Sequence, residues 1–366
     1  MGGLMFKKLK MPLVGAIAGI ISIVLVQCGN PANMGFCIAC FLRDIAGGLG
    51  LHSSQNLQYI RPEIIGILIG AFIAAIATKE WKPKGASAPL TRFVLGACVM
   101  IGALLFLGCP LRMALRIAGG DMNAVIGFVG FIAGIGAGIF FLRKGFSLKQ
   151  TYAIAKTDGM ILPIVCTLLF MTLMFFPALL SLSTAGPGAL RAPIFVALGA
   201  GLIMGGLGYI TRICFSGGIR DMFLFKSFGM FSALLVLIVV VFIGNIITGA
   251  FNFGFEGQPV AHTEWLWNFF GLFLVGFGSI LLSGCPFRQL VLAGSGNTDS
   301  TITVFGMIFG AAIAHNFGTA ASGAGVTTNG KVGFIVAVVI MLGIAVYNTF
   351  FDKAKGSDGL LANSTR

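Results

Sequence analysis

The chain has 366 residues, of which 57% are hydrophobic and only 10% are charged, and its mean hydropathy is +0.99. Soluble domains are about one quarter charged, so this composition excludes a soluble globular fold. The net charge of +13 does not indicate nucleic-acid binding, because the basic residues stand in short segments beside apolar runs and form no basic stripe with interleaved aromatics. The composition predicts an all-α, multi-pass membrane protein.

Ten apolar runs are long enough to be considered as membrane-spanning helices. In chain order they lie near residues 12–28, 62–78, 93–108, 122–142, 160–181, 193–211, 229–250, 265–284, 301–321 and 332–351. We expect a first membrane repeat over 1–181, a second over 182–351, and a disordered cytoplasmic tail over 352–366.

The basic residues between these runs predict the orientation of the chain. If the N-terminus is cytoplasmic, the Lys and Arg residues within 79–92, 143–156 and 212–226 all lie on the cytoplasmic side. The loop 251–264 then lies outside, and its only charges at neutral pH are Glu256 and Glu264. Excess Lys and Arg on the cytoplasmic side is the rule for membrane proteins. We therefore expect a protein of the bacterial inner membrane.

The most informative feature of the sequence is an internal repeat with an offset of about 176 residues. Its members are Cys37 with Arg43-Asp44, repeated as Cys214 with Arg220-Asp221, and Gly108-Cys109-Pro110-x-Arg112, repeated as Gly284-Cys285-Pro286-x-Arg288. Because each unit contains five predicted spans, the second unit must enter the membrane from the opposite side. Inverted repeats of this kind are typical of transporters, whose substrate site lies at the repeat interface near the midplane.

The Cys-Pro-x-Arg motif predicts a short helix that begins at the proline, a residue favoured at the first helical position. The run from Leu111 to Ala118 would be about 12 Å long, too short for a bilayer of ~30 Å, so we expect a re-entrant half-helix. Its N-terminus favours anions, a cysteine there gains thiolate character, and Arg112 adds a donor fork suited to oxyanions. The same reasoning applies to Cys285 and Arg288.

We therefore predict that four cysteines and four arginines line an anion path, and that the neighbouring Asp, Pro and Gly residues have structural or gating roles. The predicted path residues are Cys37, Cys109, Cys214, Cys285, Arg43, Arg112, Arg220 and Arg288, with Asp44, Asp221, Pro110, Pro286, Gly108 and Gly284 as the structural set. For the two Arg-Asp pairs a structural and a functional role are equally compatible with the pattern. Soft thiols suit a substrate that contains sulfur or selenium, although cysteine also serves as plain packing.

At the two Gly-Cys-Pro-x-Arg segments, and in its repeated five-span organisation, the chain resembles the YeeE/YedE family of bacterial sulfur-compound transporters. The resemblance extends over roughly residues 12–351 and is strongest to the branch associated with selenium metabolism. It implies uptake of thiosulfate or a selenium compound past cysteines at a central constriction. It also suggests a small cytoplasmic sulfur-carrier protein of the sulfurtransferase type as a partner. Cys40 has no counterpart in the second half, where Gly217 stands.

A membrane thiol oxidoreductase is the main alternative, because Cys37-x-x-Cys40 has redox spacing. That motif is not repeated, however. An oxidoreductase with one catalytic dithiol would also not explain why the Cys-Pro-x-Arg motif occurs twice. The three histidines, His52, His262 and His315, have no spacing typical of metal ligands. We therefore expect a transporter that is not an enzyme and has no cofactor or metal.

Overall fold

The structure is a computed structural model that describes the backbone of residues 2–351 and the side chains of residues 10–351. Residue 1 and the predicted tail 352–366 lie outside the described residues. The first half of the chain contains seven helices and two short strands that pair antiparallel. They are α1 (Gly2–Gln27), α2 (Ile38–Gly48), α3 (Pro62–Ala77), β1 (Lys84–Gly85), α4 (Pro89–Phe106), α5 (Pro110–Ala118), α6 (Met122–Arg143), β2 (Tyr152–Ala153) and α7 (Lys156–Phe175).

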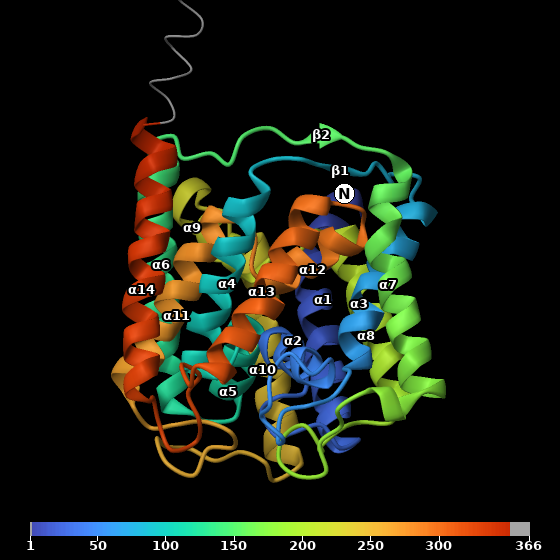
Figure 1. The fold of residues 1–366 in the computed structure, drawn as a ribbon, viewed down its shortest axis with the longest axis vertical. Helices are drawn as coiled ribbons and strands as arrows, with labels where there is room; N and C mark the ends of the chain where they lie inside the picture. Colours follow the sequence, from blue (N-terminus) through green and yellow to red (C-terminus); the bar gives the residue numbers. More distant parts are fainter. Residues whose placement is uncertain (1, 352–366) are drawn as a thin grey trace, which may run out of the picture.

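The second half repeats this order of helices, after a 3-10 turn at Pro177–Leu179. Its helices are α8 (Ile194–Thr211), α9 (Phe215–Phe225), α10 (Gly229–Ile247), α11 (Trp265–Leu281), α12 (Pro286–Gly294), α13 (Thr298–Asn316) and α14 (Thr328–Val346), followed by a π-helical turn over Tyr347–Phe351. In each half the second and fifth helices are short. Figure 1 shows α2 and α5 toward the lower end of the bundle, and α9 and α12 toward the upper end.

Within the described part of the chain, eight helical stretches are long and apolar enough to cross a membrane. Three of them join a long helix to the short helix that follows, namely α4 to α5, α8 to α9 and α11 to α12. Helix α3 is apolar but has only 16 residues, fewer than the ~20 of a full span. A mostly helical, multi-pass membrane protein is thus confirmed, whereas the number of ten spans stays a prediction.

Glycines bring helices of the two halves into direct backbone contact. A Cβ atom added at Gly15 of α1 would lie 2.1 Å from the Ala233 carbonyl oxygen of α10, and one at Gly134 of α6 would lie 2.0 Å from that of Phe273 in α11. Small residues permit such close approach of membrane helices. The same kind of contact joins α3 to α8 and α4 to α13. Each of the four pairs therefore takes one helix from each half.

The neighbours along each pair show that the paired helices run in the same direction. Gly15 approaches Ala233, Gly19 approaches Val240, and Gly244 approaches Ile23, so residue numbers rise together along α1 and α10. The equivalent pair with the halves exchanged is α8, the first helix of the second half, and α3, the third helix of the first half, and these two helices also lie side by side. The two halves are thus interleaved through these pairs rather than separate.

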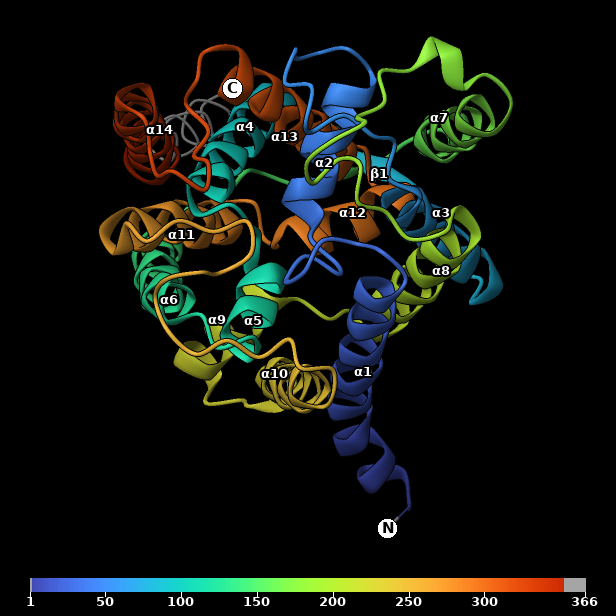
Figure 2. The same cartoon turned by 90° about the horizontal axis from the view of Figure 1, so that it is seen from below.

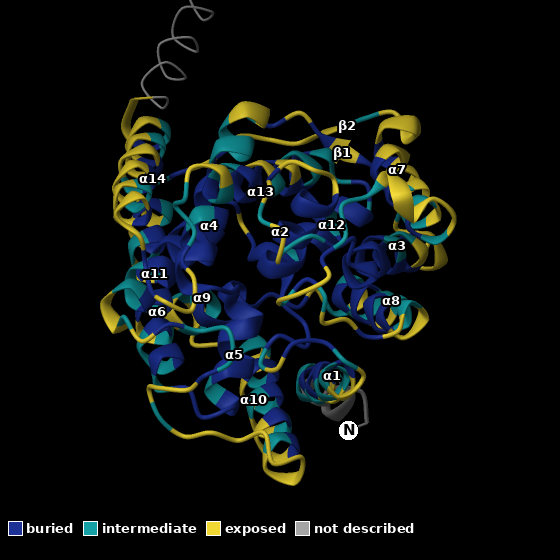
Figure 3. Cartoon of the chain, turned by 60° about the horizontal axis from the view of Figure 1, so that its bottom comes forward, coloured by how far each residue is buried: buried dark blue, intermediate teal, exposed yellow. Residues whose placement is uncertain are grey.

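Burial separates an apolar shell from a polar centre. Peripheral helices such as α7 and α14 expose large apolar side chains, for example Leu168 at 61% and Val339 at 63%, as a lipid-facing surface requires. Figures 2 and 3 show the short helices α2, α5 and α12 surrounded by the long ones and mostly buried. The repeated cysteines, Arg43 and Arg112 are therefore buried inside the helical bundle, whereas Arg220 and Arg288 are partly exposed.

Candidate functional site

The repeated residues form two clusters, one in each half of the chain. We call Cys214, Cys285, Arg220 and Arg288, with their neighbours on α9 and α12, the second half-site. We call Cys37, Cys109, Arg43 and Arg112, with their neighbours on α2 and α5, the first half-site.

In the second half-site, the N-termini of two short helices meet at one sulfur atom. Cys214 is the N-cap of α9, and its Sγ accepts a hydrogen bond from the Gly217 N–H at 3.3 Å. Cys285 is the N-cap of α12, and its own N–H donates to the Cys214 Sγ at 3.4 Å. The thiols of Cys214 and Cys285 also contact each other. Helix N-termini carry partial positive charge and free N–H groups, so two of them together favour an anion.

A cavity of about 180 Å³ opens beside Cys214. Three arginines, Arg212, Arg220 and Arg288, contribute to its wall, and the Cys214 sulfur lies within hydrogen-bond distance of the Ser216 hydroxyl, at 3.2 Å. The full lining is Arg212, Cys214, Ser216, Gly217, Arg220, Met230, Ser279, Ile280, Ser283, Gly284 and Arg288. No carboxylate is part of this lining. The cavity therefore offers positive charge, hydroxyl groups and one thiol to a small oxyanion.

Arg288 has donors to spare for a ligand. Its Nη1 donates to the Gly208 carbonyl at 3.3 Å, and this is its one hydrogen bond among the described residues. Arg220 is engaged by Asp221 at 2.8 Å, in a pair that is partly exposed. Arg212 is exposed.

A second, wider cavity of about 610 Å³ shares Arg212 and Arg288 with the first. It is lined by Lys79, Glu80, Lys82, Lys84, Tyr209, Arg212, Arg288, Leu292, Ser295 and Asn297. The basic residues outnumber the single Glu80 by five to one. The two cavities therefore share two arginines, and both linings carry an excess of positive charge.

The first half-site has the same two helix N-termini but is closed. Cys37 is the N-cap of α2, and its Sγ accepts from the Cys40 N–H at 3.4 Å. Cys109 is the N-cap of α5, and its thiol contacts that of Cys37. The side chains of Cys37, Cys40 and Cys109 are at most 1% exposed. The cysteines are therefore arranged as in the second half-site, and their side chains are almost completely buried.

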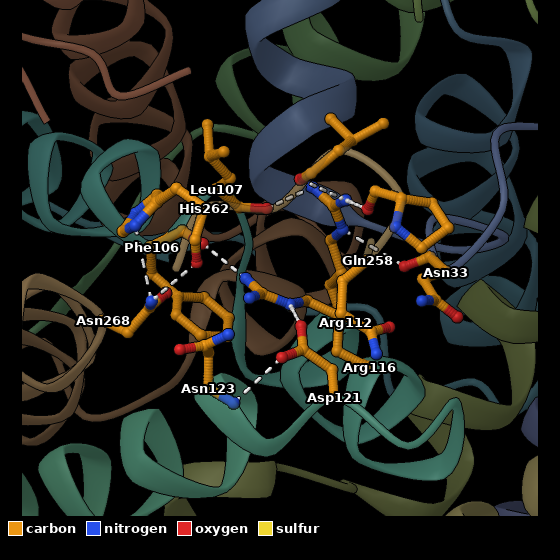
Figure 4. A network of polar contacts seen from close by, with 12 residues as sticks. Asn33, Phe106, Leu107, Arg112, Arg116, Asp121, Asn123, Gln258, His262 and Asn268 are labelled. Atoms are coloured by element: carbon orange, nitrogen blue, oxygen red, sulfur yellow. Dashed lines mark hydrogen bonds and ion pairs between the residues drawn. The ribbon is translucent and has the colours of Figure 1, made fainter. Parts of the chain in front are cut away.

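Arg112 accounts for the closure. Its guanidinium is fully buried and donates to the backbone carbonyls of Asn33 at 3.1 Å and Val260 at 3.0 Å, and also to that of Leu107 (Figure 4). Its Nη1 lies 3.4 Å from the Cys40 sulfur. The carbonyls come from three separate segments of the chain. Arg112 therefore joins these segments and has few donors left for an anion.

A buried ion pair lies beside Arg112, and its arginine is on the same helix. Arg116 donates to Asp121 at 2.7 Å and to the Phe106 carbonyl at 2.7 Å, and Asp121 in turn caps α6 by accepting from the Asn123 N–H (Figure 4). Arg116 and Asp121 are fully buried. In the second half Leu292 and Asn297 stand at the corresponding positions. The pair thus belongs to the first half-site alone, and the repeated motifs give no indication of it.

The Arg-Asp pairs also differ between the halves. Asp44 is fully buried between two arginines, with Arg43 at 2.7 Å on one carboxylate oxygen and Arg61 at 2.7 Å on the other. Arg61 donates further to the carbonyls of Pro187 and Leu190. The first pair is therefore part of a structural network that sequence reasoning did not include, because Arg61 is not repeated.

The glycine of each Gly-Cys-Pro-x-Arg motif makes room for the arginine four residues later. A Cβ at Gly108 would lie 2.8 Å from the Arg112 Cδ, and one at Gly284 would lie 3.0 Å from the Arg288 Cγ. Pro110 and Pro286 are the first residues of α5 and α12. The motif therefore begins a helix with its proline and folds the arginine stem back over its glycine.

Comparison with known proteins matches the second half of the chain. Residues 210–350, which include the second half-site, match the family described as sulphur transport. This match agrees with the resemblance of the two Gly-Cys-Pro-x-Arg segments to the YeeE/YedE family of sulfur-compound transporters. It is similar to the thiosulfate transporter TsuA of Escherichia coli (strain K12), with 34% identity over 110 residues. That alignment spans 29% of this chain and 31% of the relative. The expectation of a transporter rather than an enzyme agrees with both matches.

Proposed function

We propose that this protein moves a small sulfur- or selenium-containing anion across the bacterial inner membrane, with thiosulfate as the first candidate. One observation carries the proposal, namely the cavity of the second half-site, where three arginines, three serines and Cys214 surround a space with no carboxylate in its lining. A volume of about 180 Å³ suits a small inorganic oxyanion and few larger metabolites. The similar protein of Escherichia coli is a thiosulfate transporter, which supports the same class of substrate.

The cysteines give the proposal its preference for a sulfur or selenium compound. Hydroxyl and amide groups would suffice for sulfate, whereas a polarisable thiol makes favourable contacts with another soft atom. We propose that the anion contacts Cys214 and Cys285 in one half-site, and Cys37 and Cys109 in the other. The choice between sulfur and selenium, and a cytoplasmic sulfur-carrier partner, remain predictions from the family resemblance.

We further propose that the halves are inverted repeats and that the two half-sites lie on opposite sides of the midplane. The repeated order of helices supports this, and so does the pairing of α1 with α10 and of α3 with α8. The basic residues around the second half-site and the positive-inside rule make that side cytoplasmic. In this conformation the cytoplasmic half-site is open and the external one is closed.

Uptake into proteoliposomes tests the proposal. Labelled thiosulfate, selenite, selenate and sulfate are supplied side by side, and we expect thiosulfate or a selenium oxyanion to enter faster than sulfate. Cys285→Ala should abolish uptake, whereas Cys40→Ala should have a milder effect because Cys40 is not repeated. Cys98→Ala and Cys166→Ala are matched controls, since both thiols are buried in long helices away from the half-sites.

The same variants separate transport from thiol oxidoreductase activity. In an oxidoreductase, Cys37 and Cys40 would be essential and Cys285 dispensable. An inactive Cys40→Ala beside an active Cys285→Ala, at matched membrane abundance, would reverse our assignment. Equal entry of all four anions would contradict the sulfur or selenium preference.

A further inference from the structure

Glu63 is a fully buried carboxyl group that the proposed path does not use. It is the second residue of α3 and is 0% exposed. Its Oε1 accepts a hydrogen bond from the Asn30 amide at 2.8 Å, and its Oε2 has no hydrogen-bond partner. No ion pair to it is found among the described residues. Ionisable groups at membrane depth are costly and are candidates for function, in particular for proton binding.

The position of Glu63 in the repeat connects it to the anion path. Matched by its place as the second residue of the third helix in its half, its counterpart is Met230 of α10, which lines the open cavity of the second half-site. The offset is 167 here rather than about 176, because the loop before α3 is longer than the loop before α10. If the halves are inverted repeats, the equivalent opening of the first half-site brings Glu63 to its cavity wall. Water would then reach a carboxyl group that is sealed in the present conformation.

The charges around Glu63 make its protonation state matter for an anion. Arg61, two residues earlier, and Arg43 both pair with Asp44, so the cluster carries two positive charges and one negative charge. Asn30, on the loop after α1, is neutral, and α8 brings only backbone and apolar groups near Gly201. Tyr59, whose ring lies under Arg61 and the exposed Arg191, is a further titratable group that faces this region. His315 of α13 also lies beside the cluster, with its ring centroid 4.7 Å from that of His52.

His52 does not add charge to the cluster. Its Nε2 lies 3.1 Å from the Arg43 carbonyl oxygen in the loop after α2. Partial burial lowers the pKa of His52 from its ordinary value, and this keeps the ring neutral at neutral pH. An ionised Glu63 therefore brings the buried charges of the cluster to zero net charge, and a protonated Glu63 leaves them with one positive charge. The exposed Arg191 adds one positive charge in both states.

From this arrangement we infer that Glu63 is a proton-binding residue of the first half-site, and that its protonation and anion binding favour each other. The proton adds to the carboxylate to give the neutral acid and returns to water when the carboxyl ionises, so no other reactant is needed. An anion that enters a cell with a negative interior moves against the membrane potential, and a proton bound with it offsets part of that charge. The inference rests on the proposed function and names a second ion for the same path.

Thiosulfate uptake into proteoliposomes is the test, with KM measured while the external pH is lowered from about 8 to about 5. This pH window lies above the ordinary pKa of carboxyl groups, so exposed carboxylates stay ionised throughout it. For the wild type we expect KM to fall by about fivefold or more, the size of a typical coupling between two sites. Glu63→Gln keeps an acceptor for Asn30 but cannot titrate, so its KM should be low at every pH. Glu256→Gln, in the exposed loop 251–264, is the matched control and should behave as the wild type.

A wild-type KM that does not change with pH would overturn the inference, and so would an unchanged pH dependence in Glu63→Gln. Uptake would still proceed in both cases, so the proposed function would stand. No thiosulfate uptake by the wild type at any pH would overturn both. If Glu63→Gln fails to fold, proton uptake by the detergent-solubilised wild type on addition of thiosulfate, followed as a pH rise in weak buffer, decides instead. No such rise would contradict the inference.

Discussion

The two half-sites are built from the same motif, yet only one of them is open. In both, two cysteines cap two short helices and a glycine makes room for an arginine stem. In the second, Arg288 donates to one carbonyl and faces a cavity, whereas in the first Arg112 donates to carbonyls from three segments. The repeated motif therefore determines the short helix and its cap, whereas the surrounding segments determine whether the guanidinium of the motif arginine has donors left for a ligand.

The residues that differ between the half-sites follow the same division. Ser216, Ser279 and Ser283 line the open cavity, and Ala39, Ala103 and Leu107 stand at the corresponding positions of the closed one. Hydroxyl groups can bind water or an anion, whereas apolar side chains pack without a polar partner. The first half-site is therefore suited to closure between transport events, and the second to holding a solvated anion.

The two aspartates should give the largest difference in stability. Asp44→Ala would leave Arg43 and Arg61 buried without their carboxylate, and breaking a buried pair in this way costs about 3–5 kcal/mol. Asp221→Ala removes a partner from a pair that water already reaches, at a cost of about 1 kcal/mol or less. Thermal unfolding of the detergent-solubilised variants measures the difference. Equal shifts in the unfolding midpoint would contradict the assignment of a structural role to the first pair alone.

The two arginines should separate stability from transport. Arg288→Ala should leave the unfolding midpoint nearly unchanged and raise KM for the anion about tenfold to a hundredfold, the effect of losing one charge-assisted contact of about 1.5–3 kcal/mol. Arg112→Ala should lower the unfolding midpoint, because several buried carbonyls lose their donor. Arg288→Lys keeps the charge without the planar fork and should give an intermediate KM. An unstable Arg288→Ala beside a stable Arg112→Ala would invert the comparison.

Thiol labelling should give the smallest but most local difference. Cys214 lines the open cavity, so a membrane-impermeant anionic thiol reagent should modify it from the cytoplasmic side, and substrate should slow the reaction. Cys37 and Cys109 should react slowly from either side, since both are at most 1% exposed. Single-cysteine variants in oriented vesicles, followed by mass spectrometry, provide the measurement. Rapid labelling of Cys109 from outside would show that the first half-site opens readily.

The sequence by itself determined the class of the protein, the approximate position of its long helices and the two repeated motifs. Hydropathy over ~20 residues is a local property, and a proline at the first position of a helix acts through its own ring. The start of α5 at Pro110 and of α12 at Pro286 could therefore be derived without any knowledge of the fold. The spans predicted near 62–78 and 301–321 are not among the eight stretches long and apolar enough to cross a membrane, because α3 is short and α13 carries a weaker local hydropathy signal.

Only the tertiary structure decided which arginine is free. Arg112 and Arg288 have the same local sequence context, but the carbonyls that occupy Arg112 belong to residues as far away in the chain as Val260. The sequence likewise does not distinguish Glu63 from an ordinary acidic residue in the first turn of a helix. Only the structure shows that its side chain is buried and that one of its oxygens has no hydrogen-bond partner. Long-range packing brings these groups together, and because burial determines what an unpaired charge or polar atom costs, no local pattern could assign their roles.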